Sequence, residues 1–130
     1  MRLLLNTHVF LWFISADARL PQAVVDAIRD PGSEIYLSAV SVWEVSIKYR
    51  LGKLPLPQPP ETYLPFQRNQ HGITSLPLDE STITHLPALP DLHRDPFDRI
   101  LLCQAAEYGL TVVTADDTLL AYPATFLRAK

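Results

Sequence analysis

Short apolar runs alternate along the chain with stretches of helical spacing, and this alternation restricts the fold more than any other feature of the sequence. The runs that fit buried strands, the last of them an edge strand, lie at residues 2–5, 34–37, 73–76, 111–114 and 125–127. Helices are predicted between them at residues 7–13, 21–29, 39–51, 79–86 and 96–109, with a helical turn at 118–121. The proline-rich residues 54–65 are expected to be mostly irregular around a brief helix. Strands separated by helices in this way predict an α/β fold with a central parallel sheet.

The length and composition of the chain predict one compact domain over residues 1–130. A chain of 130 residues can bury a substantial core, and no repeat, low-complexity tract or linker divides it. The net charge of −3 argues against a protein that holds nucleic acid by net charge alone. It does not argue against a nuclease, because bound divalent cations supply a local positive field.

The N-terminal region and the single cysteine indicate a cytoplasmic protein without a membrane segment. Residues 2–18 imitate a signal peptide loosely, but Asn6, Thr7 and His8 interrupt the apolar run. No apolar run approaches the length of a membrane span. Cys103 lies in an apolar helical pattern, which favours a small core residue in a reducing compartment.

Acidic side chains stand where the predicted strands and helices begin or end. Asp95 and Asp98 lie at the start of the helix at 96–109, and Asp116 and Asp117 follow the strand at 111–114. In parallel sheets, ligands gather at the carboxyl ends of the strands. Carboxylates in such a position suit hard cations such as Mg²⁺ and Mn²⁺. The first strand, however, ends at Asn6, an amide.

Helix capping offers a structural explanation for some of these acids. Asp95 is placed to cap the helix at 96–109, with Asp98 in its first turn, where an acid favours the helix dipole. One cap needs one acid, so we expect Asp98 to be functional and Asp95 to be mainly structural. Either Asp116 or Asp117 can cap the turn at 118–121, which leaves the other for chemistry.

Glu44 is the acid with the weakest structural explanation, because its neighbours on the predicted helix are apolar. An ion pair with Lys48, four residues on, is the alternative role, worth roughly 0.2–0.5 kcal/mol. Other chemistries fit poorly, since the chain has no glycine-rich phosphate loop, no cysteine pair for zinc and no nucleophile elbow. The four histidines show no metal-ligand spacing; they are His8, His71, His85 and His93.

Four segments, in order along nearly the whole chain, resemble the PIN-domain ribonucleases, and most closely the VapC-type toxins of bacterial toxin–antitoxin pairs. They lie at residues 3–12, 41–48, 93–101 and 114–116, with the run from Asp95 to Arg99 the most specific. The resemblance implies a three-layer α/β/α sandwich around the parallel sheet and an acidic cluster that binds Mg²⁺ or Mn²⁺. It also implies cleavage of RNA, commonly tRNA, a homodimer, and an antitoxin whose C-terminal segment covers the active site.

The resemblance also assigns roles to individual residues of this sequence. The catalytic and metal-binding acids are Glu44, Asp98 and Asp116, and Asn6 is a fourth metal ligand standing where the family has an aspartate. Outer positions fall to Asp95, Thr114 and Asp117, and phosphate contacts to Arg94 and Arg99. In the mechanism implied, the cation polarises a phosphate oxygen and lowers the pKa of a water that one of the acids orients.

Asn6 separates the alternatives for function. An amide oxygen can ligate a hard cation but brings no negative charge, so we expect a metal-dependent endoribonuclease that is weakened or inactive. The alternative is a PIN-like module that binds RNA or a protein partner without cleaving. A small-molecule phosphohydrolase is disfavoured, because the first strand lacks the nucleophilic aspartate that such enzymes need.

The helix at 7–13 is apolar on nearly every side, which predicts a second partner for it. We therefore expect that Trp12 and Phe13 are not both buried in the monomer, and that another copy of the chain or the antitoxin covers what remains.

Overall fold

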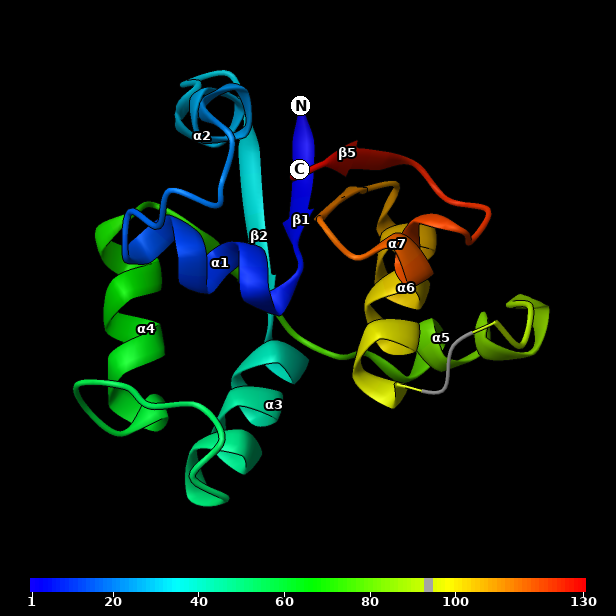
Figure 1. Cartoon of the computed structure of the whole chain (residues 1–130). Helices are drawn as coiled ribbons and strands as arrows, with labels where there is room; N and C mark the ends of the chain where they lie inside the picture. Colours follow the sequence, from blue (N-terminus) through cyan, green and yellow to red (C-terminus); the bar gives the residue numbers. More distant parts are fainter. Residues whose placement is uncertain (93–94) are drawn as a thin grey trace.

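The computed structural model describes residues 1–92 and 95–130, which form a five-stranded parallel sheet between two layers of helices (Figure 1). The strands are β1 (Arg2–Leu5), β2 (Glu34–Ser38), β3 (Thr74–Leu76), β4 (Thr111–Thr114) and β5 (Phe126–Arg128). Their order in the sheet is β3-β2-β1-β4-β5, and every pair is parallel. The predicted parallel α/β/α sandwich is confirmed.

Helices cover both faces of the sheet and one of its ends (Figure 1). One face carries α1 (Thr7–Ile14), α2 (Gln22–Arg29) and α4 (Pro60–Gln70). The other carries α5 (Glu80–Ile83), α6 (Pro96–Tyr108), α7 (Asp117–Leu120) and the short 3-10 turn η1 (Leu86–Ala88). The remaining helix, α3 (Ala39–Arg50), lies across the carboxyl end of the sheet.

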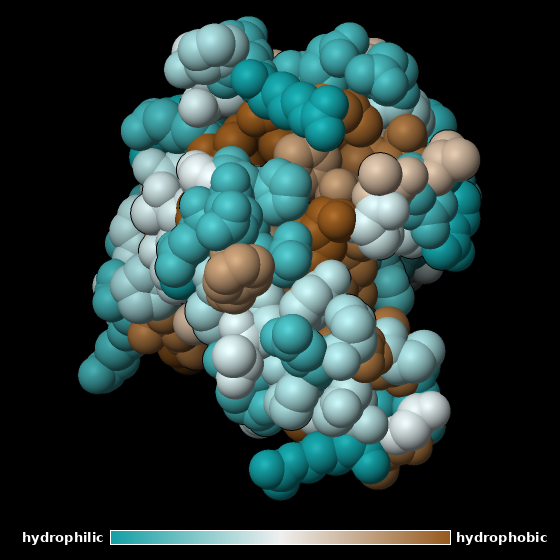
Figure 2. All heavy atoms as spheres, turned by 90° about the vertical axis from the view of Figure 1, so that its left-hand side faces the viewer, coloured by the Kyte–Doolittle hydropathy of each residue, from teal (hydrophilic) through white to brown (hydrophobic). Residues whose placement is uncertain are grey.

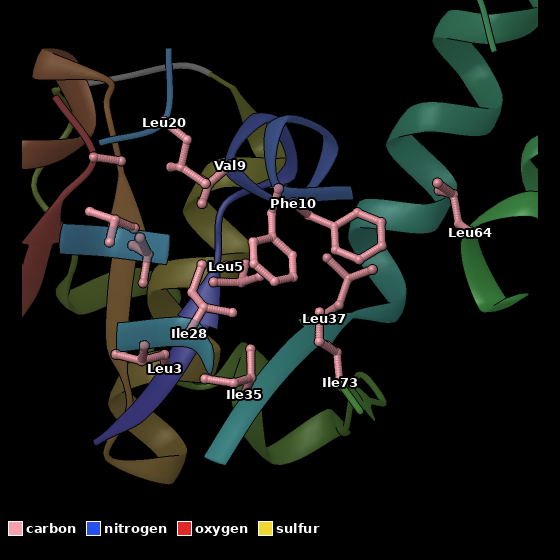
Figure 3. Close-up of a cluster of buried hydrophobic side chains, with 14 of the residues drawn as sticks. Leu3, Leu5, Val9, Phe10, Leu20, Ile28, Ile35, Leu37, Leu64 and Ile73 are labelled. Carbon is pink, nitrogen blue, oxygen red and sulfur yellow. The ribbon is translucent and has the colours of Figure 1, made fainter. Parts of the chain in front are cut away.

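The central strand β1 divides its side chains between two hydrophobic cores. Leu3 and Leu5 point into the core under α1 and α2, and Leu4 points into the core under α6, because successive residues of a strand face opposite sides. Figure 3 shows the first core, where the ring of Phe10 from α1 lies over Leu5 and toward Leu37. Cys103 is fully buried on α6, and burial raises the pKa of its thiol, which fits the core residue expected.

The proline-rich segment differs from the prediction. Residues 54–65 were expected to be mostly irregular, but α4 starts at Pro60 and continues for 11 residues with Pro65 inside it. A proline within a helix loses one intrahelical hydrogen bond. The complete burial of Leu64 and the packing of α4 against α3 offset this loss. The helix predicted at 79–86 is also broken, into α5 and η1.

The outer side of α1 carries three half-buried apolar residues, Leu11, Trp12 and Ile14, next to the exposed His8. Phe13 is buried, whereas Trp12 is only half-buried and holds the Arg19 guanidinium 5.1 Å from its ring centroid. Figure 2, which looks onto the α1 and α4 side of the molecule, shows hydrophobic atoms gathered between polar margins. None of the helices in the described part of the chain has the length and apolar character to cross a membrane.

Candidate functional site

The strand order places a topological switch point between β1 and β4. From β1 the chain runs outward to β2 and β3 on one side, and β4 and β5 are added on the other. At such a point the carboxyl ends of neighbouring strands leave a crevice where ligands bind. Asn6 follows β1 and Asp116 follows β4, while α3 and α6 bring Glu44 and Asp98 to the same place.

These four side chains line one cavity of about 270 Å³, so their predicted convergence is confirmed. Asp95 and Thr114, both predicted to lie in the outer shell, also line it. The sequence analysis did not assign to the site the other residues of the lining, which are His8, Val9, Trp12, Lys48 and Ala115. The roles of the acids as catalysts and metal ligands stay predictions.

Both the oxygen and the nitrogen of the Asn6 side-chain amide form hydrogen bonds within the protein. Its Oδ1 accepts from the backbone N–H of His8 at 3.2 Å and thereby caps α1. Its Nδ2 donates to Asp98 Oδ1 at 3.3 Å, across a buried contact. The amide therefore presents an N–H donor to the nearest acid of the cavity, where the carboxylate of an aspartate would present only acceptors.

Asn6, and not the neighbouring Thr7, caps α1, and Thr7 is the first helical residue. The hydroxyl of Thr7 instead lies 2.8 Å from Glu44 Oε1 and donates to it. Asparagine and threonine are both favourable helix caps, so either Asn6 or Thr7 could have capped α1. The contact with Glu44 on α3 commits the threonine side chain elsewhere.

Glu44 is held by two donors although it is almost fully buried, at 3% exposure. Oε1 accepts from Thr7, and Oε2 lies 2.5 Å from Lys48 Nζ. The ion pair with Lys48, given above as the alternative role of Glu44, is therefore present. Lys48 also lines the cavity, so this pair places a positive charge among the acids.

Asp95 caps α6, as predicted, and positions Asp98. Its Oδ1 accepts from the backbone N–H of Phe97 at 2.9 Å and of Asp98 at 3.3 Å. Pro96 takes the first helical position, which suits a residue without an N–H. Asp98 is 7% exposed and faces the cavity from the first turn of α6.

Replacing Asp95 by alanine is expected to lower the free energy of unfolding by about 1 kcal/mol, because two N–H groups lose their acceptor. Asp95→Asn retains the cap and is expected to lower the free energy of unfolding by only a few tenths of a kcal/mol. Urea denaturation monitored by circular dichroism measures both. Asp26→Ala, which removes an exposed acid that accepts from the side chain of Gln22 and caps no helix of the described residues, is the matched control. Equal losses in Asp95→Ala and Asp26→Ala would contradict the capping role.

Asp116 and Asp117 have separate surroundings. Asp116 caps α7, its Oδ1 accepting from Thr118 N at 2.9 Å, and its own N–H donates to the buried Thr114 hydroxyl at 3.1 Å. Asp117 does not line the cavity, although an outer position there was predicted for it. Its exposed carboxylate pairs with Lys130 at 2.5 Å, and this contact lowers its pKa.

Arg99, which was predicted to contact phosphate, forms hydrogen bonds within the protein instead. Its Nη1 donates to the carbonyl of Pro90 at 3.0 Å and to the Tyr122 hydroxyl at 3.1 Å, and it does not line the cavity. The predicted phosphate contact at Arg94 lies outside the described residues, as does His93. Among the described residues, Lys48 lines the cavity and brings there the positive charge that was expected of an arginine.

The donor atoms of the cavity are those that hard divalent cations prefer, namely carboxylate and amide oxygens. The carboxylates are, however, engaged by donors of the protein itself: Lys48 on Glu44, Asn6 on Asp98 and the α7 backbone on Asp116. Within the described residues, no three His, Cys, Asp or Glu side chains are arranged to hold a metal ion. The residues therefore fit such an ion by ligand type, and the ion would compete with these internal donors.

Comparisons with known proteins agree with the fold and extend it. The family model of the PIN domain matches residues 3–124. Ribonuclease VapC16 of Mycobacterium tuberculosis (strain ATCC 25618 / H37Rv) is 38% identical over 74 residues, which are 52% of this chain and 52% of that protein. The match thus spans about half the length of this relative. Ribonuclease VapC22 of the same organism is 28% identical over 117 residues, 89% of this chain and 88% of that protein.

Solved structures share the fold over the full length at low identity. VapBC2 from Rickettsia felis, bound to a DNA fragment from its promoter, aligns with a TM-score of 0.75 at 13% identity and covers 100% of both chains. VapBC-5 from Mycobacterium tuberculosis, described as a member of the VapBC family of toxin–antitoxin systems, aligns with a TM-score of 0.60 at 18% identity, covering 99% of this chain and 98% of that one.

Proposed function

Because the chain belongs to the PIN domain family, whose model matches residues 3–124, we propose that it is the ribonuclease toxin of a toxin–antitoxin pair. Two relatives are named ribonucleases, and the structures that share its fold include toxin–antitoxin complexes. The observation that carries the proposal is the cavity at the switch point, where Glu44, Asp98 and Asp116 come together from three separate elements.

The proposed reaction is endonucleolytic hydrolysis of RNA, dependent on Mg²⁺ or Mn²⁺ held by Glu44, Asp98 and Asp116 with Asn6 as the fourth ligand. A bound ion of this kind neutralises phosphate charge and lowers the pKa of an attacking water. One of the three carboxylates orients that water for in-line attack. Asp95 and Thr114 hold the segments that carry Asp98 and Asp116, through the cap of α6 and the bond to the Asp116 N–H.

Asn6 weakens this site in two ways. It removes one of four negative charges, and it turns an N–H toward Asp98 Oδ1, the atom that a cation would need. Together with the ion pair of Lys48 on Glu44, this contact favours a second candidate function, a PIN module that binds RNA without cleaving it.

The proposed partner is an antitoxin that covers the exposed side of α1, with a second copy of the chain as a further contact. A groove of about 540 Å³ runs beside α1, lined by apolar side chains that include Leu11, Leu54 and Leu56. It shares His8 and Trp12 with the acid cavity, so one bound segment can reach both. We place the protein in the cytoplasm, where such RNA substrates and antitoxins are made.

RNA cleavage by the Asn6→Asp protein tests the proposed function. Total cellular RNA incubated with this variant in Mg²⁺ is expected to yield discrete fragments, and a chelator is expected to prevent them. The chain as it stands is expected to cleave slowly or not at all. If Asn6→Asp leaves the RNA intact under all conditions while the chain still binds RNA, the binding module replaces the nuclease.

A further inference from the structure

An exposed aromatic side chain directly precedes one of the acids that line the cavity. Trp43 is 60% exposed, although it directly precedes Glu44, which is 3% exposed. Its indole meets the ring of Phe97 edge-to-face, with the centroids 5.0 Å apart and the planes at 79°. Phe97 in turn directly precedes Asp98. Two aromatic rings thus flank the two most buried acids of the site and touch each other across α3 and α6.

Helix geometry explains this arrangement. Consecutive residues of an α-helix point about 100° apart, so the residue next to one that lines a cavity points in a different direction while its backbone stays close to the cavity. Glu44 and Asp98 line the cavity. Trp43 and Phe97 do not themselves line it, but each is the neighbour in sequence of an acid that does, and their T-shaped contact fixes the orientation of the indole. The contact leaves most of Trp43 in solvent, so core packing does not account for a tryptophan here.

A cation lies on the same face of α3 as Trp43. Arg50 follows seven residues later, two turns along the helix, which places it about 10 Å further along the same stripe. It is exposed, and within residues 1–92 and 95–130 it forms no ion pair. Proteins that bind single-stranded nucleic acid combine aromatic rings that stack on bases with basic side chains that follow the phosphates.

We propose that Trp43, oriented by Phe97, stacks on an unpaired nucleobase of the RNA next to the phosphate in the cavity, and that Arg50 contacts the backbone further along. The inference rests on the proposed function and adds a substrate preference to it: the strand must be unpaired where it passes α3. Trp43 is a positioning residue, because it touches the substrate away from the reacting phosphate. It strengthens binding and fixes register without taking part in hydrolysis.

Tryptophan fluorescence can isolate this contact, because the chain has only two tryptophans. In a Trp12→Phe background all tryptophan emission comes from Trp43. Titration with a short unstructured oligoribonucleotide in Mg²⁺ at low salt is expected to quench this emission as the base stacks. The same oligonucleotide with its bases removed is expected to quench little. A fully paired duplex is expected to bind more weakly than the single strand.

Substitutions separate stacking from other roles. Trp43→Ala is expected to weaken oligonucleotide binding roughly tenfold, and Trp43→Phe much less, because stacking needs an aromatic face. Phe66→Ala is the matched control, since Phe66 is 56% exposed on α4 and is expected to leave binding unchanged. Circular dichroism and thermal unfolding verify that each variant is folded. Each variant is expected to fold, because Trp43 and Phe66 are both exposed.

The possible results distinguish the inference from the function on which it rests. If the parent protein binds the oligonucleotide and Trp43→Ala binds it equally well, the inference is overturned and the proposed function stands. If no variant binds RNA at all, both fail. If Trp43→Ala loses self-association or binding of a co-expressed antitoxin while RNA binding is unchanged, the aromatic pair is a protein interface and the inference is again overturned.

Discussion

The Asn6→Asp form is expected to bind Mn²⁺ about tenfold more tightly than the chain as it stands, or better, and to be toxic when expressed without an antitoxin. The substitution returns a negative charge to a cavity that already holds Glu44, Asp98 and Asp116. It also removes the Asn6 N–H that now occupies Asp98 Oδ1. The α1 cap is expected to survive, because aspartate accepts the His8 N–H as well as asparagine does.

Electrostatics set the size of this effect. Two unit charges 4 Å apart interact by about 4 kcal/mol at an effective dielectric constant of about 20. Desolvation and the mutual repulsion of the acids offset much of that, so a net gain of about 1–3 kcal/mol remains. Without metal the added carboxylate lies against Asp98, so the variant is expected to unfold at a lower temperature than the parent and to recover stability when Mn²⁺ is added.

Titration calorimetry with Mn²⁺ and thermal unfolding with and without the ion measure these changes independently of RNA cleavage. Within the Asn6→Asp form, Asp98→Asn is expected to return both metal affinity and cleavage to background. Asp95→Asn is expected to reduce them less, because its cap persists. Unchanged Mn²⁺ affinity in Asn6→Asp would show that the cavity is not a metal site.

Phe10→Ala is expected to destabilise the protein by about 3–5 kcal/mol. Phe10 is 1% exposed and fills the space between α1 and the sheet, in contact with the core that Figure 3 shows. Truncation leaves a cavity between a helix and a strand that both have fixed positions, so little collapse can fill it. A loss of this size is a large part of the stability of an ordinary domain.

Phe66→Ala again gives the matched control, because it removes the same type of side chain from an exposed position. Its free energy of unfolding is expected to stay within about 0.5 kcal/mol of that of the parent. Urea denaturation gives both values. Because Asn6 caps α1 and lines the cavity, Phe10→Ala is also expected to loosen the cavity before the domain unfolds. Near-equal losses at positions 10 and 66 would mean that α1 does not depend on this core.

Local patterns were enough to predict the sheet and the positions of Asn6 and Asp116 at strand ends, whereas the full set of four site residues also rested on the family resemblance. Leu3 to Leu5 form an apolar run that fits a buried strand better than the start of a signal peptide, so Asn6 was expected at a carboxyl end, where it lies. The same rule placed Asp116. The ion pair of Glu44 with Lys48 was predictable because both residues lie on one helix, four positions apart.

Side-chain directions that depend on distant partners could not be predicted in this way. The Thr7 hydroxyl does not cap α1, because it donates a hydrogen bond to Glu44 on α3. Arg99 turns away from the cavity because Tyr122 and the Pro90 carbonyl accept its N–H groups. Asp117 turns to Lys130 near the end of the chain. In each case the sequence contains both partners but no local signal that joins them.

The order of the strands determines when the site can form during synthesis of the chain. β1 is the first strand to be synthesised, yet it lies in the middle of the sheet, between β2 and β4. A nascent chain can pair β1 with β2 early, but the other edge of β1 stays open until residues 111–114 have left the ribosome. Asp116 follows only then. Glu44, Asp98 and Asp116 therefore cannot line one cavity until β4 has been synthesised and has paired with β1.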